Sequence, residues 1–139
     1  MSDYRGDIDV TEAWRRLGED PAAVLIDVRT RAEWQYVGLP DLSPLGKEVV
    51  PIEWKRYPDN APNSGFVAEV FGRALAADTP ILLICRSGQR SRDAAIALTA
   101  AGFENCTNVD SGFEGPLDAD GHRGAAGGWK AAGLPWRQS

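Results

Sequence analysis

The most constraining feature of the sequence is a run of four aliphatic residues that ends in a cysteine, Ile81-Leu-Leu-Ile-Cys85. Pro80 precedes the run. Because no position in it is charged or strongly polar, a strand formed here must be covered on both faces, which is typical of a central strand in a parallel sheet. The run therefore predicts a buried strand whose carboxyl end presents Cys85.

The rest of the chain alternates between strand patterns and helix patterns. We expect four further strands, at residues 8–10, 24–28, 49–54 and 107–109, and helices at residues 11–17, 30–36, 66–77, 91–101 and 129–132. Thr11 is the expected N-cap of the first helix, and Pro51 favours an edge position for its strand. The alternation predicts an α/β fold with a five-stranded parallel sheet flanked by helices on both faces. Its active site is expected beyond the carboxyl ends of the strands.

The size and charge of the chain limit what it can be. With 139 residues, 43% hydrophobic and 25% charged, it has the composition of one soluble domain, expected over residues 1–139 with a core at about 8–136. No apolar run approaches the ~20 residues of a membrane span. The first residues also lack an apolar signal region, so we expect a cytoplasmic protein. A net charge of −5 argues against nucleic acid or a membrane as partner.

The chain has two cysteines, Cys85 and Cys106, and one histidine, His122. They make no CxxC pair and no set with metal-ligand spacing. We therefore expect free thiols, no metal site and no organic cofactor. Cys106 is expected to pack in the core, and His122 is expected to lie on the surface.

The loop expected after the central strand, Cys85-Arg-Ser-Gly-Gln-Arg-Ser91, has the features of an anion site. Gly88 allows backbone angles that let the loop curl with its N–H groups inward, where the next helix begins. Arg86 and Arg90 add positive charge that suits a small anionic substrate. A thiolate at the centre would be stabilised and would act as a nucleophile. The alternative is that Cys85 is only a small buried residue, but a loop of this kind before a helix argues against it.

Three motifs, in this order along the chain, resemble those of the rhodanese-like sulfurtransferases. The cysteine loop resembles the family's active-site loop. The other two motifs are Leu25-Ile-Asp-Val-Arg29 followed by Glu33-Trp34 and Gly38, and Gly128-Trp-Lys-Ala-Ala-Gly-Leu-Pro135. The resemblance implies an α/β fold with five parallel strands. It also implies transfer of sulfane sulfur from a small anionic donor such as thiosulfate, through a cysteine persulfide, to cyanide or a thiol, including a protein thiol.

The resemblance assigns roles by position. Cys85 would be the catalytic, persulfide-forming residue. The substrate-binding loop would consist of Arg86, Ser87, Gly88, Gln89 and Arg90, and the supporting residues would be Asp27, Arg29 and Ser91. We expect Asp27 to pair with Arg90 or a loop amide and Arg29 to face the mouth of the pocket, unless both belong to a purely structural ion pair. Glu33 is expected to be structural, because a stabilised thiolate needs no general base.

Two segments depart from the family pattern. Leu39-Pro40-Asp41 follow Gly38, where the family usually has a histidine. The stretch from Gly112 to Gly128 looks expanded, and it brings in Glu114, Asp118, Asp120, His122 and Arg123. An expanded loop near the active site could form a lid or a docking surface, or it could be solvated decoration. We hypothesise that it shapes the choice of sulfur acceptor.

Two other functions stay open at this point. A cysteine phosphatase or arsenate reductase also holds an anion over a cysteine, but the phosphatases place their arginine six positions after the cysteine. Arg90 lies five positions after Cys85, and the smaller ring suits one sulfur atom better than a phosphoryl group. The second alternative is a sulfur relay or binding module with little thiosulfate turnover. The two loop arginines favour an anionic donor such as thiosulfate.

Overall fold

The computed structural model describes residues 3–56, 59, 61–115, 119–122 and 127–138. At its centre lies a sheet in the order β1 (Asp7–Ile8), β8 (Cys106–Val109), β7 (Ile81–Ile84), β2 (Val24–Asp27) and β4 (Val50–Pro51). Every pairing within this sheet is parallel. The predicted α/β class and the five parallel strands are therefore confirmed, and Pro51 lies in an edge strand as expected.

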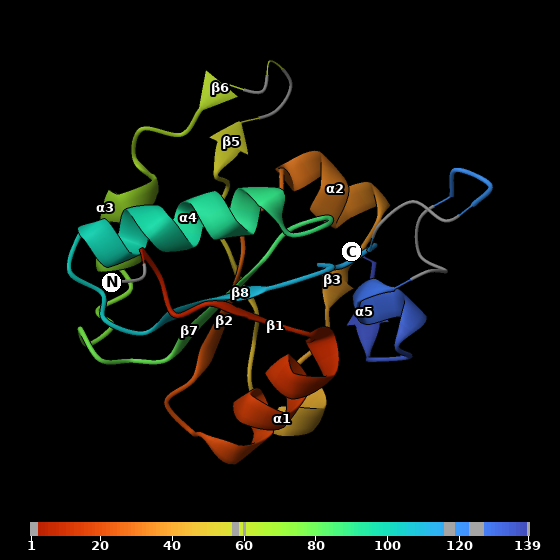
Figure 1. The fold of residues 1–139 in the computed structure, drawn as a ribbon, viewed down its shortest axis with the longest axis horizontal. Coiled ribbons are helices and arrows are strands. Elements are labelled where there is room, and N and C mark those ends of the chain that lie inside the picture. The colour runs from red at the N-terminus through yellow and green to blue at the C-terminus, as the bar shows by residue number, and fades with distance from the viewer. Residues whose placement is uncertain (1–2, 57–58, 60, 116–118, 123–126, 139) are drawn as a thin grey trace.

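Helices cover both faces of this sheet (Figure 1). One face carries α1 (Val10–Glu19) and α5 (Gly128–Ala131), and the other carries α3 (Phe66–Phe71) and α4 (Gln89–Ala100). A hydrophobic cluster lies on each face of the sheet, and the side chains of β7 alternate between the two. Leu82 and Ile84 pack in the cluster on the α1 side, whereas Ile81 and Leu83 pack in the cluster on the α4 side. Cys85 continues the second set, so its side chain points to the α4 face. Within the described ranges, no helix has the length and apolarity that crossing a membrane requires.

The start of the chain differs from the prediction by a few residues. Val10 was expected to end the first strand but begins α1, and it is buried. The N-cap is Asp9 rather than Thr11, because the Asp9 carboxylate accepts the N–H of Glu12 at 2.8 Å. A carboxylate at this position both caps the first turn and complements the helix dipole.

The helices on the other face also have different ends from those expected. α3 ends at Phe71 instead of Ala77, and the chain then turns through Ala74, which has a φ of +59°. The alanines there bury too little surface to extend the helix. α4 begins at Gln89 instead of Ser91, because Gly88 adopts a φ of +108° at the N-cap. The longer helix brings its first turn closer to the end of β7.

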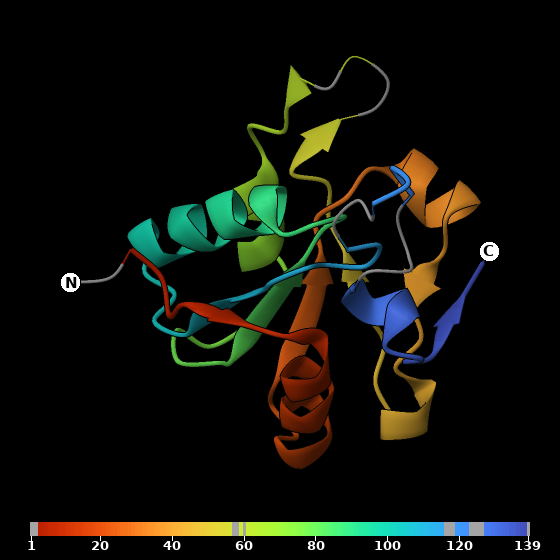
Figure 2. The ribbon, with the colours of Figure 1, turned by 45° about the vertical axis from the view of Figure 1, so that its right-hand side comes forward.

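Two short antiparallel strand pairs were not predicted. They are β3 (Leu39–Pro40) with β9 (Trp136–Arg137), and β5 (Lys55–Arg56) with β6 (Ala61–Pro62). Along the chain, β3 lies between α2 (Arg31–Tyr36) and the 3-10 helix η1 (Ser43–Leu45), whereas β9 is the last element, so their pairing ties the C-terminal segment to the body. The second pair stands out from the body on the side of α2 and α4 (Figure 2). The strand expected over residues 49–54 is thus shorter, and Lys55 opens a separate element.

Candidate active site

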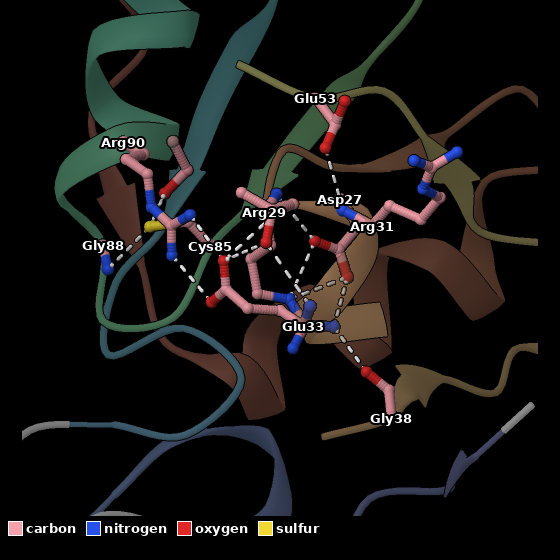
Figure 3. A network of polar contacts seen from close by, with 11 residues as sticks. Asp27, Arg29, Arg31, Glu33, Gly38, Glu53, Cys85, Gly88 and Arg90 are labelled. Carbon is pink, nitrogen blue, oxygen red and sulfur yellow. Dashed lines mark hydrogen bonds and ion pairs between the residues drawn. The ribbon is translucent and has the colours of Figure 1, made fainter. Parts of the chain in front are cut away.

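Cys85 lies at the carboxyl edge of the sheet, where β7 ends and the turn into α4 begins (Figure 3). The residue is 1% exposed. The N–H of Gly88 donates to its sulfur over 3.1 Å, and the Ser91 hydroxyl lies 3.2 Å from the same atom. The positive φ of Gly88 turns this amide toward the sulfur, and the first turn of α4 adds its dipole. The amide and the hydroxyl can thus both donate a hydrogen bond to the sulfur.

The cysteine loop keeps this shape because residues 112–115, which we call the clamp segment, hold its backbone. The Cys85 carbonyl accepts the N–H of Phe113 at 2.8 Å, and the Arg86 carbonyl accepts those of Glu114 at 3.0 Å and Gly115 at 3.1 Å. With these two carbonyls engaged outside, the loop can turn amide hydrogens toward the sulfur. Gly112 permits the close approach, since a Cβ on it would lie 2.4 Å from the Cys85 carbonyl oxygen.

Behind the sulfur, polar side chains connect α4 to two strands. Ser91 Oγ lies 2.5 Å from Asn108 Oδ1, while Asn108 Nδ2 donates to Asp7 Oδ1 at 2.9 Å and to the Gly88 carbonyl at 3.2 Å. Ser91 is 0% exposed and Asn108 is 2% exposed. The sequence prediction named Ser91 but missed Asn108. The sequence signal for Asn108 was a polar residue in the middle of a predicted strand, 107–109.

Arg90, which was predicted to bind an anionic donor, is held by Glu33. Its two terminal nitrogens donate to the two carboxylate oxygens at 2.7 and 2.8 Å. Glu33 also accepts the backbone N–H and hydroxyl of Thr30, the N-cap of α2, so a capping box fixes the carboxylate. Burial opposes the charge of each partner, but their hydrogen bonds outweigh it: the pKa of Glu33 is lowered and the pKa of Arg90 is raised. The positive charge of Arg90 is therefore largely neutralised.

Asp27 and Arg29 form an ion pair at the end of β2, and both are 0% exposed. Arg29 donates to the carboxylate from Nε at 2.9 Å and from Nη2 at 2.7 Å, and Nη2 also donates to the Gly38 carbonyl at 2.6 Å. The guanidinium lies 4.3 Å above the Phe113 ring. Asp27 thus pairs with Arg29 instead of Arg90 or a loop amide, and Arg29 is enclosed instead of facing a pocket mouth. The structure agrees with the alternative expectation, that the two residues belong to one ion pair. Because both charged groups are buried away from solvent, each depends on the other to offset the cost of burying its charge.

A polar hollow of about 300 Å³ opens beside the cysteine loop, and it is lined by Thr30, Glu33, Lys55, Arg86 and Arg90. Arg86 is exposed and Lys55 is half-buried. Within the described part of the chain, neither has a carboxylate partner. Because Arg90 is paired, these two residues supply the available positive charge. The sequence prediction missed Lys55, because residues 49–54 were expected to form one strand and no element was expected directly after it.

The other predicted loop residues lie farther toward solvent. Ser87 is half-buried and Gln89 is exposed. The Gln89 side-chain oxygen accepts a hydrogen bond from Arg92 at 3.2 Å, so it is engaged along the surface of α4. The structure thus brings Gly88, Ser91 and the neighbouring Arg90 closest to Cys85.

Outside the loop, Cys106 and the long stretch after β8 were also singled out. Cys106 is 0% exposed, and burial raises the pKa of its thiol to about 11, which keeps it protonated as a packing residue. His122 is exposed, as expected. Asp118 and Arg123 lie outside the described residues, and the hypothesis about acceptor choice stays a prediction. Within this stretch, the clamp segment contacts the cysteine loop.

Known proteins resemble the chain over nearly its whole length. A family model described as the STR4 middle domain matches residues 6–139. Uncharacterized protein RC0915 of Rickettsia conorii is 39% identical over 127 residues, which cover 91% of this chain and 93% of that protein. Thiosulfate sulfurtransferase GlpE of Pseudomonas savastanoi pv. phaseolicola is 30% identical over 95 residues, 68% of this chain and 73% of that protein. Rhodanese-like domain-containing protein 4, chloroplastic, of Arabidopsis thaliana is 26% identical over 125 residues, 89% of this chain and 24% of that protein.

A solved structure extends the likeness to three dimensions. The crystal structure of Rv0390 from M. tuberculosis matches with a TM-score of 0.89 and 52% identity, covering 98% of this chain and 99% of that one. The relatives and the fold together support a sulfurtransferase-type or related role. The chain belongs to the STR4 middle domain family and is a rhodanese-like domain.

Proposed function

We propose that the protein is a sulfurtransferase that carries sulfane sulfur as a persulfide on Cys85, from an anionic donor such as thiosulfate to cyanide or a thiol. The observation that carries the proposal is the setting of the Cys85 sulfur at the first turn of α4. Two hydrogen-bond donors, the Gly88 amide and the Ser91 hydroxyl, lie within 3.1 and 3.2 Å of it. These groups can stabilise a thiolate without a general base. The thiosulfate sulfurtransferase GlpE among the relatives supports the same chemistry.

The proposed reaction has two displacement steps on sulfur. The Cys85 thiolate attacks the outer sulfur of thiosulfate, a new S–S bond forms, and the old S–S bond breaks with its electron pair leaving on sulfite. The acceptor, cyanide or a thiolate, then attacks the outer sulfur of the persulfide. Its S–S bond breaks, and the pair returns to Cys85 as a thiolate. Neither step needs an outside oxidant or reductant.

The polar hollow is the proposed seat of the donor's oxyanion group. Arg86 and Lys55 line it without carboxylate partners among the described residues. Arg90, in contrast, is paired with Glu33, which offsets most of its positive charge. It would therefore act on the sulfur mainly through the weak electric field that the pair leaves. We therefore assign the electrostatic recognition of the donor to Arg86 and Lys55, with Arg90 in a supporting place.

Replacing Lys55 with methionine is expected to raise the KM for thiosulfate about tenfold with little change in kcat. The side chain would contact the donor oxygens alike in the ground state and in the transition state, so its loss weakens binding and leaves the chemical step. Initial rates at varied thiosulfate measure both constants. Arg73→Gln is the matched control for charge, since this exposed residue follows α3 in the connection to the opposite, amino end of β7. An equal KM in both variants would place the donor elsewhere.

Steady-state assays of the unmodified protein test the function itself. With thiosulfate and cyanide we expect saturable production of thiocyanate, and with an aryl phosphate we expect no hydrolysis. Hydrolysis of the phosphate without thiocyanate production would favour the phosphatase reading and sink the proposal. Sulfur exchange with a thiol but no sustained turnover would indicate the relay alternative instead.

A further inference from the structure

The Ser91 hydroxyl has a single hydrogen, but it faces two atoms that can accept it. Cys85 Sγ lies 3.2 Å from its oxygen, and Asn108 Oδ1 lies 2.5 Å away. A hydroxyl can donate to only one of them at a time and can accept from the other partner if that partner carries a hydrogen. The position of this one hydrogen must therefore depend on whether the cysteine is a thiol or a thiolate.

The orientation of the Asn108 amide is determined by its other contacts. Its Nδ2 donates to Asp7 Oδ1 at 2.9 Å and to the Gly88 carbonyl at 3.2 Å. If the amide were flipped, its oxygen would face those two acceptors, and a buried side chain cannot afford two such repulsive contacts. The amide oxygen therefore points at Ser91 in every protonation state of the cysteine.

We propose that Asn108 is a positioning residue that competes with Cys85 for the Ser91 hydrogen. In the thiol form, the thiol donates to Ser91 and Ser91 donates to Asn108. In the thiolate form, Ser91 must turn its hydrogen to the sulfur, which leaves two oxygens 2.5 Å apart with no hydrogen between them. Asn108 thus disfavours the bare thiolate relative to the thiol.

This competition gives the nucleophile a useful property. A thiolate that is stabilised too strongly is a weaker nucleophile, because nucleophilicity falls as the thiol becomes more acidic. Once a persulfide has formed, the negative charge lies on the outer sulfur and no longer on Sγ. Ser91 can then return its hydrogen to Asn108. On the proposed sulfurtransferase function, Asn108 would therefore favour the loaded state over the bare thiolate.

Other charges surround Cys85, and the test must separate Asn108 from them. The groups that face this region are Arg86 in the loop, Arg90 on α4 with Glu33 of α2, the Asp27–Arg29 pair at the end of β2, Asp7 on β1, and Asp110 after β8. Changing Ser91 leaves all of them in place, whereas changing Asn108 also removes the amide hydrogen bonds to Asp7 and to the Gly88 carbonyl, with or without Ser91. A double-mutant cycle on these two residues isolates their coupling from the fixed background.

The test is the pH dependence of thiolate formation at Cys85, followed by ultraviolet absorbance with Cys85→Ala as the reference. Asn108→Leu is expected to shift the midpoint by about one unit toward acid, the worth of one hydrogen bond. Ser91→Ala is expected to shift it toward alkali, because the thiolate loses a donor. In the Ser91→Ala background, Asn108→Leu is expected to cause almost no shift, because the hydrogen for which Asn108 competes is gone.

Two further variants keep the test decisive. Asn108→Ala also removes the acceptor and replaces the leucine variant if that one does not fold. Thr107→Val is the control: it changes the buried residue of β8 just before Asn108 and is expected to leave the midpoint unchanged. Equal shifts from Asn108→Leu with and without Ser91 would show that Asn108 acts through the general structure. An alkaline shift would overturn the proposal outright. Since thiolate titration does not require a sulfur donor, either failure can be told apart from failure of the sulfurtransferase function.

Discussion

Replacing Arg29 with leucine is expected to lower the free energy of unfolding by about 3–5 kcal/mol. Arg29 and Asp27 are both 0% exposed, so the variant leaves a fully buried carboxylate without its guanidinium partner. It also deprives the Gly38 carbonyl of its Arg29 donor. The large fall in unfolding free energy follows from the unpaired charge of Asp27 rather than from the lost contact alone. Denaturant titration followed by tryptophan fluorescence measures this fall.

Two control variants separate these causes. Arg29→Leu combined with Asp27→Leu is expected to be more stable than Arg29→Leu alone, because no unpaired charge stays buried. Arg15→Gln breaks surface ion pairs with Glu12 and Glu19 and is expected to leave unfolding almost unchanged. If Arg29→Leu unfolded no more easily than Arg15→Gln, the buried pair would not be a support of this end of β2.

Replacing Gly112 with alanine is expected to damage both stability and sulfur transfer. The new Cβ would lie 2.4 Å from the Cys85 carbonyl oxygen and 2.6 Å from the Arg86 carbonyl carbon, so the backbone of the cysteine loop must move. We expect a loss of about 2–4 kcal/mol in unfolding free energy from overpacking and the positive φ. We also expect a fall of about 100-fold in kcat/KM, because the nucleophile is displaced.

Gly46→Ala is the matched control for backbone strain. Gly46 has a φ of +70°, close to the +65° of Gly112, but a Cβ there would meet no atom within 4 Å. It is expected to lose only about 1–2 kcal/mol and to keep full activity. Equal activity losses in the two variants would mean that the clamp segment does not hold the cysteine loop.

The parts of the fold that depend on local pattern could be predicted from the sequence. The run before Cys85 had no polar position, so burial on both faces followed, and β7 lies in the middle of the sheet. Gly88 was expected to adopt unusual backbone angles, and its φ is +108°. β7 ends at Ile84 and α4 begins directly after Gly88, so this local pattern places Cys85 between the strand and the helix N-terminus.

The contacts of several site residues could not be predicted, because they depend on the folded arrangement and not on spacing along the sequence. Nothing near Asp27 in the sequence distinguishes pairing with Arg29 from pairing with Arg90, and the choice depends on which guanidinium is enclosed. Lys55 reaches the hollow through a strand pair that has no clear pattern in the sequence. Asn108 acts through a register between β8 and β1 that only the folded sheet defines.

The intact mass of the protein after incubation with thiosulfate shows directly whether Cys85 carries sulfur. Persulfide formation on Cys85 predicts a gain of one sulfur atom that is lost on adding cyanide and is absent in Cys85→Ala. The gain is expected to persist in Cys106→Ala, because the Cys106 thiol is buried and protonated. An unchanged mass at saturating thiosulfate, or a sulfur atom that persists in Cys85→Ala, would contradict persulfide formation on Cys85.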